Sequence, residues 1–427
     1  MVTLFLAGIL GLTLGYYLWL VRAQNLLVAR AEAWNSALAL AEAGVEEGLA
    51  QINVSFGTNY ASSARANWGS SGPGIYGPRS NALDTGSYSV VLIATNSGPM
   101  LIATGYAASP VLSNGQFITR TVQVTTTVNP AFRYALGSGQ GISLNGNSVA
   151  IDSFDSSNPD YSTAEMYNPQ KRKAAADVAA TTGFTNGGIV QINGTLRTGP
   201  GVGPNLGTGG FIGGPSFHGP GIECSRDYSS DFNQQFRPVL PLNTVSFTPP
   251  VCGTGTNRYV LNGGNFIING DLTLNSGNAI SVTGSGDSVL FVAGNVIMAG
   301  PQGGAPGASI NIAPGCNLLL YVSGPSATLT QVNTAGPAST FQYYGLPSNT
   351  SVTWNGNTEF IGGIYAPQAC LTLGGGTSYH HHTQYQFQGA CMANSISLNG
   401  YFKFHYDEAL KHTLSPVGFV VTSWHEL

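Results

Sequence analysis

The chain begins with MVTLFLAGILGLTLGYYLWLV, residues 1–21, a stretch without a charged residue or a proline. Helical spacing of apolar residues then continues through an alanine-rich stretch to about residue 53. A helix of that length spans roughly 80 Å at about 1.5 Å per residue. Its first half is apolar on all sides, and such a helix is buried in lipid or against copies of itself. The sequence therefore predicts a long N-terminal helix followed by a water-soluble body.

This N-terminal stretch differs from a cleaved secretory signal peptide. A signal peptide has a basic segment, a shorter apolar core and then a small-residue cleavage site. Nothing basic precedes the apolar run here, and helical spacing continues after Arg22. We expect the second half of the helix to pack on a globular domain through an apolar stripe at three- and four-residue intervals. That stripe consists of Leu27, Trp34, Leu38, Ala41, Val45, Leu49 and Ile52.

An apolar run joined directly to an amphipathic helix with AEAGVE at residues 41–46 resembles the type IV pilin and pseudopilin superfamily, and in particular its minor-pilin branch. The resemblance covers residues 1–53. It implies that the helices form the core of an extracellular filament after a membrane-inserted stage, with the inner membrane and the pilus assembly machinery as partners. Family members lose a leader that ends in a small residue, and we expect the present numbering to start at the mature end.

One position departs from the family pattern. Members usually carry a glutamate at the fifth mature position, which can neutralise the terminal amine of a neighbouring subunit, whereas this chain has Phe5 and no acid before Glu32. Subunit register would then depend on shape, because Gly8, Gly11 and Gly15 let helices approach closely. A permanent single-span anchor is the alternative explanation of these glycines. The residues expected in filament contacts are Met1, Leu4, Phe5, Gly8, Leu10, Gly11, Leu14, Gly15, Leu18 and Trp19.

The composition excludes two classes of protein. Only 8% of the residues are charged and the net charge is −4, so no basic patch is available to bind nucleic-acid phosphates. Apolar and aromatic residues are too frequent for a disordered chain. Because 427 residues exceed one ordinary domain, we expect at least two modules after the helix.

The first of these modules is expected at residues 54–130. Runs rich in β-branched residues at 88–94, 100–106 and 117–128 are separated by turn-forming clusters, which predicts a small antiparallel sheet. The alternation in TVQVTTTV would place one face of this sheet on the lower half of the helix. The apolar C-terminal segment, residues 413–427, is expected to pair with this sheet or to cap the solenoid domain expected at residues 131–412. Docking on another subunit is the alternative.

Residues 131–412 have a different sequence pattern. Short apolar runs are interrupted every few residues by Asn-Gly, Gly-Gly and Ser-Gly pairs, which favours a β-solenoid with loop insertions over a hairpin sandwich. Segments 142–147, 362–367 and 405–410 resemble β-helical domains that follow pilin-like helices in surface proteins. The expected fold class is thus α+β and mostly β: a long helix, a small antiparallel sheet and a large domain like a parallel β-helix.

The cysteines offer two candidate disulfides. Cys370 and Cys391 are separated by about one expected coil, and Cys224 and Cys252 flank a loop-rich insertion. An exported protein would meet an oxidising environment that permits both bridges. Cys316 is left over. The alternative is that all five cysteines are small hydrophobic core residues.

Metal and catalytic sites are expected to be absent. His380, His381 and His382 are weak metal candidates, because adjacent strand residues point to opposite faces and the glycine-rich surroundings favour an exposed loop. No cofactor is expected. Paired carboxylates can hydrolyse glycosides, but Asp152 and Asp155 lie among turn-forming residues. The basic run from Lys171 to Lys173 precedes residues 174–179, for which a brief helix or a coil edge is expected.

The function that these observations favour is that of a structural subunit. It would polymerise through its N-terminal helix into an extracellular type IV pilus-like filament and display a β-rich domain at the cell surface. Two alternatives remain. The chain is a minor or tip pilin-like adhesin that binds a partner or a carbohydrate, or it is a membrane-tethered β-helix enzyme that acts on polysaccharides.

Overall fold

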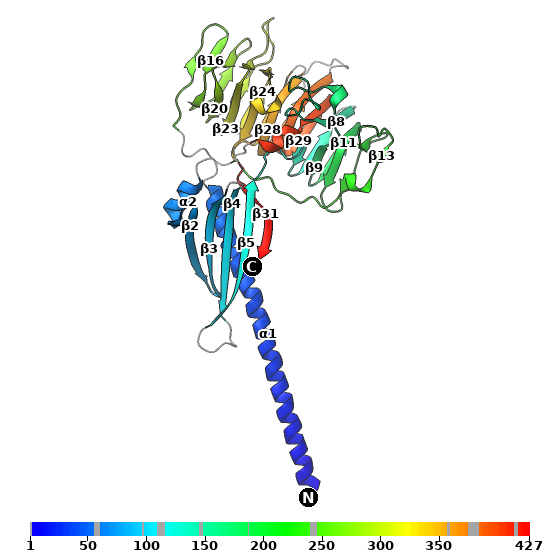
Figure 1. The fold of residues 1–427 in the computed structure, drawn as a ribbon. Coiled ribbons are helices and arrows are strands. Elements are labelled where there is room, and N and C mark those ends of the chain that lie inside the picture. Colours follow the sequence, from blue (N-terminus) through cyan, green and yellow to red (C-terminus); the bar gives the residue numbers. More distant parts are fainter. Residues whose placement is uncertain are drawn as a thin grey trace. The chain divides into compact units, whose positions relative to one another are not determined.

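The computed structural model describes residues 2–54, 60–95, 98–108, 116–144, 148–186, 188–239, 246–356, 359–374, 384–413 and 417–427. The chain forms two compact units, which Figure 1 shows as a ribbon. The helix-sheet unit contains Met1–Asn129 and Gly418–Leu427, and the β-rich unit contains Pro130–Val417. The β-rich unit is therefore an insertion between two segments of the helix-sheet unit.

The helix-sheet unit is built on one long helix, α1 (Val2–Val54). No proline interrupts this segment, and its leucines and alanines favour helix. A second helix, α2 (Tyr60–Trp68), follows. The predicted long N-terminal helix is confirmed.

A six-stranded antiparallel sheet packs on the second half of α1. Side chains along β4 alternate between buried and half-buried, the pattern of a sheet that covers a core with one face. The last strand of the chain, β31, pairs with β5 and completes the sheet. The predicted antiparallel sheet is confirmed. Its strands in spatial order are β1 (Ser70–Gly72), β2 (Ile75–Leu83), β3 (Gly86–Thr95), β4 (Gly98–Ala108), β5 (Phe117–Val128) and β31 (Phe419–Glu426).

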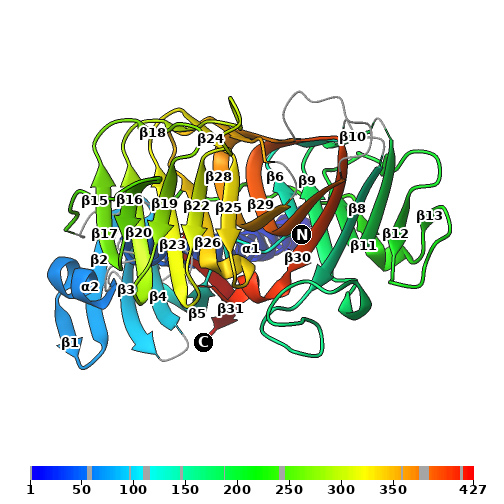
Figure 2. The same cartoon turned by 90° about the horizontal axis from the view of Figure 1, so that it is seen from above.

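Parallel ladders make up most of the β-rich unit, as Figure 2 shows. Ala279 pairs with Ser309, and Ser309 pairs with Gln331, so successive partners are 30 and 22 residues apart. The first ladder runs through β17 (Gly264–Ile268), β20 (Gly286–Val292), β23 (Cys316–Val322), β26 (Phe341–Gly345), β28 (Glu359–Gly374) and β29 (Gln384–Asn399).

Two further ladders are formed mostly by the strands that lie between successive strands of the first ladder in the sequence. The second runs through β18 (Leu272–Leu274), β21 (Val296–Met298), β24 (Ser326–Leu329), β27 (Ser351–Trp354) and the second halves of β28 and β29. The third runs through β15 (Val251–Cys252), which is antiparallel, and then β16 (Asn257–Leu261), β19 (Ala279–Val282), β22 (Ser309–Ile312) and β25 (Gln331–Thr334).

The other strands of this unit come mostly from earlier in the chain. They are β6 (Leu136–Ser138), β7 (Gly141–Leu144), β8 (Ser148–Phe154), β9 (Ala176–Ala180), β10 (Gly183–Asn186), β11 (Ile189–Thr198), β12 (Phe211–Gly213), β13 (Gly221–Ile222), β14 (Tyr228–Ser229) and β30 (Tyr401–Asp407). Short 3-10 helices lie at Pro169–Lys171, Ser225–Asp227, Ala338–Thr340 and Glu408–His412.

The order of these strands differs from a solenoid that adds coil after coil. The first half of β29 pairs with β30, whereas its second half pairs with β6, which lies some 250 residues earlier in the chain. In the same way β11 pairs with β8 through its first half and with β9 through its second. Together with the pairings of β30 with β8 and of β6 with β9, these contacts close a circuit of six parallel strands. The chain thus enters and leaves this unit beside β29.

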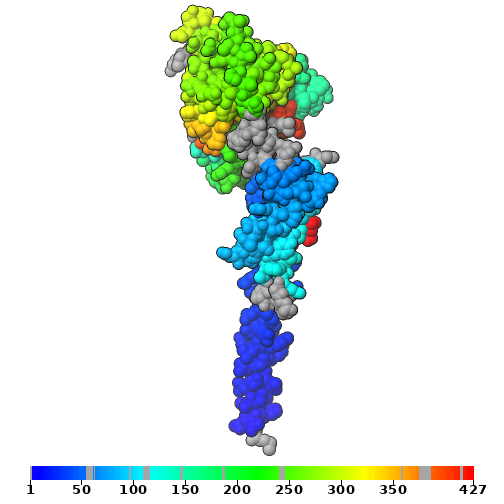
Figure 3. Space-filling view, turned by 90° about the vertical axis from the view of Figure 1, so that its left-hand side faces the viewer, coloured from blue at the N-terminus to red at the C-terminus, as the bar shows by residue number. Residues whose placement is uncertain are grey.

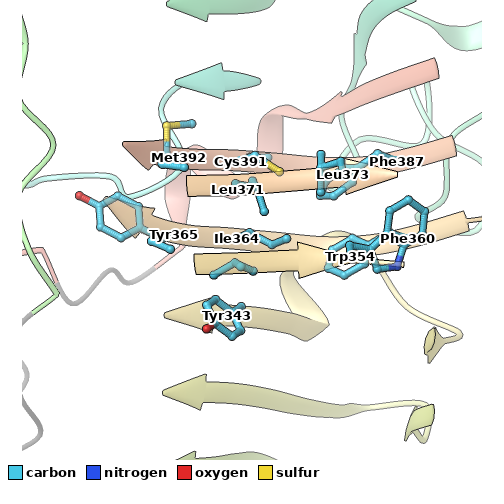
Figure 4. Close-up of a cluster of buried hydrophobic side chains, with 14 of the residues drawn as sticks. Tyr343, Trp354, Phe360, Ile364, Tyr365, Leu371, Leu373, Phe387, Cys391 and Met392 are labelled. Atoms are coloured by element: carbon cyan, nitrogen blue, oxygen red, sulfur yellow. The ribbon is translucent and has the colours of Figure 1, made fainter. Parts of the chain in front are cut away.

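The core of the β-rich unit contains stacked aromatic rings (Figure 4). Phe360, Phe387 and Phe404 occupy paired positions in β28, β29 and β30, and their ring centroids are 4.6 Å apart at both steps. Trp354 is fully buried beside them, and its indole nitrogen donates to the carbonyl oxygen of Thr330 at 2.7 Å. The parallel register therefore places like residues directly above one another in the core.

Both predicted disulfides are wrong, because all five cysteines are free. Cys370 pairs with Ser395 and is exposed, whereas Cys391 pairs with Ile364 and is buried, so the two thiols lie on opposite sides of the strands. Cys224 lies between β13 and β14 and Cys252 lies in β15, and Figure 2 shows β13 and β15 at opposite ends of the β-rich unit.

Candidate functional site

The candidate site is the surface of the first half of α1. Among the described residues, α1 is the one helix long and apolar enough to span a membrane, with a mean hydropathy of 1.9 in its most apolar window. None of that window is buried. In Figure 3 the first part of α1 projects beyond the sheet of its own unit, with its side chains uncovered.

Large apolar side chains surround this half of the helix. Leu4 is 82% exposed, Phe5 72% and Trp19 63%. Soluble monomers rarely expose a continuous apolar surface of this size, which marks an interface with protein or lipid. The exposed large side chains are Val2, Leu4, Phe5, Leu6, Ile9, Leu10, Leu12, Leu14, Tyr16, Tyr17, Leu18, Trp19 and Leu20.

The residues predicted for filament contacts lie on this surface, except Met1, which is outside the described residues. A methyl group added at Gly8, Gly11 or Gly15 would meet no atom within 4 Å. These glycines therefore serve no packing purpose within the subunit. Gly11 and Gly15 are four residues apart, so they lie on one helix face and leave room for a second helix.

Polar side chains on the first half of the helix are few. The hydroxyl of Thr13 donates to the backbone carbonyl oxygens of Ile9 and Leu10, at 3.0 Å each. The first charged residue is Arg22. A helix satisfies its own backbone hydrogen bonds, which is what an apolar environment requires.

The second half of α1 meets the sheet through small residues. A methyl group added at Gly44 or Gly48 would come within 3.1 Å of Tyr88 or 2.8 Å of Leu101. Of the predicted stripe, Ala41, Val45 and Ile52 are buried, and Leu38 and Leu49 are partly buried against the same core. The helix residues buried on the sheet are Ala33, Ala37, Leu40, Ala41, Gly44, Val45, Gly48 and Ile52.

Two residues of the predicted stripe are not in that interface. Leu27 is 68% exposed and Trp34 is 47% exposed. Leu27 lies before Ala33, the first buried residue of the helix, and Trp34 lies beside the buried face, on which alanines, glycines and Leu40 make the contact. The signal that sequence reasoning missed is the spacing of Ala33, Ala37 and Ala41, four residues apart.

Trp34 instead contacts the sheet edge through a charged side chain. The guanidinium of Arg120 on β5 lies 4.9 Å from the centre of the Trp34 ring. Arg120 also donates to both carboxylate oxygens of Glu426 on β31, and these hydrogen bonds lower the pKa of that carboxyl. This cluster joins α1, β5 and β31.

The weaker site candidates do not form one site. His380, His381 and His382 lie outside the described residues. Asp155 accepts hydrogen bonds from Ser157, and Lys171 donates to the backbone carbonyl oxygens of Pro159 and Ser162, so these two residues hold a loop together. In the part of the chain that the structure describes, no three His, Cys, Asp or Glu side chains are arranged to hold a metal. Asp152 lies apart from both, next to His405.

Comparisons with known proteins give limited matches. Residues 245–413 match the model of a domain of unknown function, DUF7305. The crystal structure of the competence-associated pilin ComZ from Thermus thermophilus is similar at 11% sequence identity, with 92% of this chain and 97% of that chain covered, and a TM-score of 0.30. No curated protein matches the chain.

Proposed function

We propose that this chain is a structural subunit of an extracellular pilus-like filament that assembles through the first half of α1. The single observation that carries the proposal is that one half of a continuous helix is packed on its sheet, while the other half is apolar and uncovered. A helix that only anchored a domain would need no small-residue face. The row of Gly8, Gly11 and Gly15 is better explained by close helix contacts.

The energetics favour burial of this surface. Burying one large apolar side chain contributes roughly 1.5–3 kcal/mol. Thirteen such side chains lie exposed between Val2 and Leu20, so their burial contributes on the order of 20–40 kcal/mol before the cost of association. A lipid bilayer can bury the same apolar surface, so we propose a membrane-inserted stage before assembly. The inner membrane and the pilus assembly machinery would then be partners of the chain.

The sheet with the packed half of α1, and the β-rich unit, would face water at the cell surface. The β-rich unit, which we regard as similar to a parallel β-helix despite its closed circuit of strands, has few charges and many polar uncharged residues. We propose no enzymatic role for it, because Asp155 and Lys171 are engaged in loop hydrogen bonds.

Immunogold electron microscopy of material sheared from producing cells tests this proposal. We expect gold particles along the length of extracellular fibres. Labelling confined to fibre tips would favour the adhesin alternative. Recovery of the protein only as a monomer in the membrane fraction would overturn the filament proposal.

A further inference from the structure

A polar cavity of about 450 Å³ lies on the β-rich unit, and the filament proposal gives it no role. Its floor is the outward face of β28, β29, β30, β8 and β11, strands that run side by side in Figure 2. Glu359, Gln386, Lys403, Ala150 and Gln191 are paired in succession across these strands and form one row of the floor.

A second row lies two residues further along the same strands. It contains Gln388, His405, Asp152 and Asn193, which all line the cavity. The residues between the two rows, such as Phe387 and Phe404, are buried in the core. Because strand side chains alternate between the two faces, both rows face the cavity.

His405 is held in one orientation by two contacts. Its Nδ1 lies 2.5 Å from Oδ1 of Asp152, and its ring stacks on the ring of Tyr167 at a centroid distance of 3.5 Å. The Tyr167 hydroxyl donates to the other oxygen of Asp152 at 2.7 Å. Burial and the nearby Asp152 carboxylate raise the pKa of Tyr167, so its hydroxyl stays a donor. This arrangement directs Nδ1 at the carboxylate and leaves Nε2 for another partner.

Two side chains that line this cavity each have a buried polar atom without a partner. These atoms are Nε2 of His405 and Oδ1 of Asn193, and the two residues are 3% and 6% exposed. They are two of only four such side-chain atoms found in the described part of the chain. A buried polar atom without a hydrogen bond costs about 1–3 kcal/mol and is rare in native proteins. Two of them on side chains that line one cavity indicate a ligand.

The charges of the cavity indicate the chemistry of that ligand. The acids are engaged: Asp152 with His405, and Glu359 with the amide nitrogen of Gln388 at 2.7 Å. The cations are less engaged. Arg172 donates from one nitrogen to the carbonyl oxygen of Pro215, and Lys403 lies between Gln386 and Ala150 on the floor. A ligand with a carboxylate would complement Lys403 and Arg172.

We propose that this cavity binds an acidic sugar, a hexuronate unit of a polysaccharide. Its carboxylate would contact Lys403 and Arg172, and its hydroxyls would donate to Nε2 of His405 and Oδ1 of Asn193. An inorganic anion offers few hydrogen-bond donors for these two atoms, and a neutral sugar offers no charge for the two cations. The volume suits a ligand of one or a few sugar units.

Calorimetric titration of the full-length chain in detergent with oligogalacturonate, and with the same oligomer as its methyl ester, tests this proposal. We expect the acid to bind and the ester to bind at least about tenfold more weakly, because the ester keeps the hydroxyls and loses the charge. Equal binding of acid and ester, or no binding of the acid, would overturn the proposal. None of these outcomes bears on filament formation.

Two variants localise the binding. Lys403→Met should weaken binding about 10–100-fold, whereas Arg226→Met, which removes an exposed cation outside the cavity, should leave it unchanged. Asn193→Leu should weaken binding while leaving the melting temperature unchanged or higher, because it removes an unpartnered buried atom. A residue with a purely structural role would give the opposite stability result. Unchanged affinity in both Lys403→Met and Asn193→Leu would contradict the assignment.

Discussion

At the scale of single residues, the contact between α1 and β4 depends on the absence of one carbon atom. A Cβ at Gly105 would lie 2.0 Å from the carbonyl oxygen of Ala37 and 2.6 Å from the backbone nitrogen of Ala41. Both neighbours are backbone atoms, which cannot move out of the way as a flexible side chain would. The helix can approach the sheet this closely only because Gly105 has no side chain.

Gly105→Ala should therefore destabilise the helix-sheet unit by about 1–3 kcal/mol or more, the range typical of overpacking. Chemical denaturation followed by tryptophan fluorescence would measure the loss. Gly72→Ala, in the same unit, is the matched control, because a methyl group there meets no atom closer than 3.6 Å. Similar stabilities for the two variants would show that the close approach at Gly105 is unimportant.

The Arg120–Glu426 pair makes the stability of the docked strand β31 depend on pH. The pKa of Glu426 is lower in the folded chain than in the unfolded chain, because Arg120 donates to its carboxylate. The pair therefore stabilises the docked strand above the unfolded-state value of about 4.3, and this contribution is lost as the pH falls through the folded value. Hydrogen exchange of β31, corrected for the intrinsic rates, should show less protection at low pH in the wild type. In Glu426→Gln this pH dependence should be much reduced, and an unchanged profile would rule out the pair as its source.

At the scale of elements, the sequence predicted α1 and the antiparallel sheet because both have a clear periodicity. The first half of α1 is a long apolar run without proline, the apolar spacing of its second half is helical, and the side chains of β5 alternate. The face of the lower helix was harder to predict. Large residues such as Leu27 and Trp34 belong to the predicted stripe, whereas the observed contact with the sheet is made mainly by alanines and glycines.

Gly8, Gly11 and Gly15 form a row on the first half of α1, the second feature at the scale of elements. Gly11→Leu should leave the subunit folded, because the position is open in the subunit, and should prevent filament formation, because a second helix could no longer approach. Thermal unfolding and electron microscopy would measure the two effects. Ala50→Leu, an exposed position on the lower half of α1, is the control. Normal filaments in Gly11→Leu would contradict the role of this row.

At the scale of the whole molecule, the sequence does not specify which strands pair. Short apolar runs predict strands, but offsets of 22 to 30 residues cannot be read from them, and the register between β29 and β6 joins residues about 250 apart. The disulfide predictions failed for this reason. The sequence does not predict the cavity for the same reason, since Asp152 and His405 are 253 residues apart.

Because the β-rich unit is inserted between β5 and β31, we expect that this unit can be removed without unfolding the helix-sheet unit. Val128 and Phe419 are paired neighbours in the sheet, and the backbone nitrogen of Asn129 donates to Gly418 at 2.7 Å. A short turn in place of residues 130–417 should therefore join the two strands as a hairpin. We expect a small subunit that keeps its circular dichroism spectrum for helix and sheet and still assembles. An unfolded product would show that the helix-sheet unit needs its insertion.

The central claim is that the first half of α1 is covered by other copies of the same helix. Photo-crosslinking on intact cells tests it most directly, with a crosslinking amino acid at Leu14 and, as the control, at Glu46 on the exposed face of the packed half. The account predicts a ladder of multimers of this chain from Leu14 in the sheared extracellular fraction, and none from Glu46. Crosslinking of Leu14 to lipid alone, with no multimers outside the cell, would contradict it.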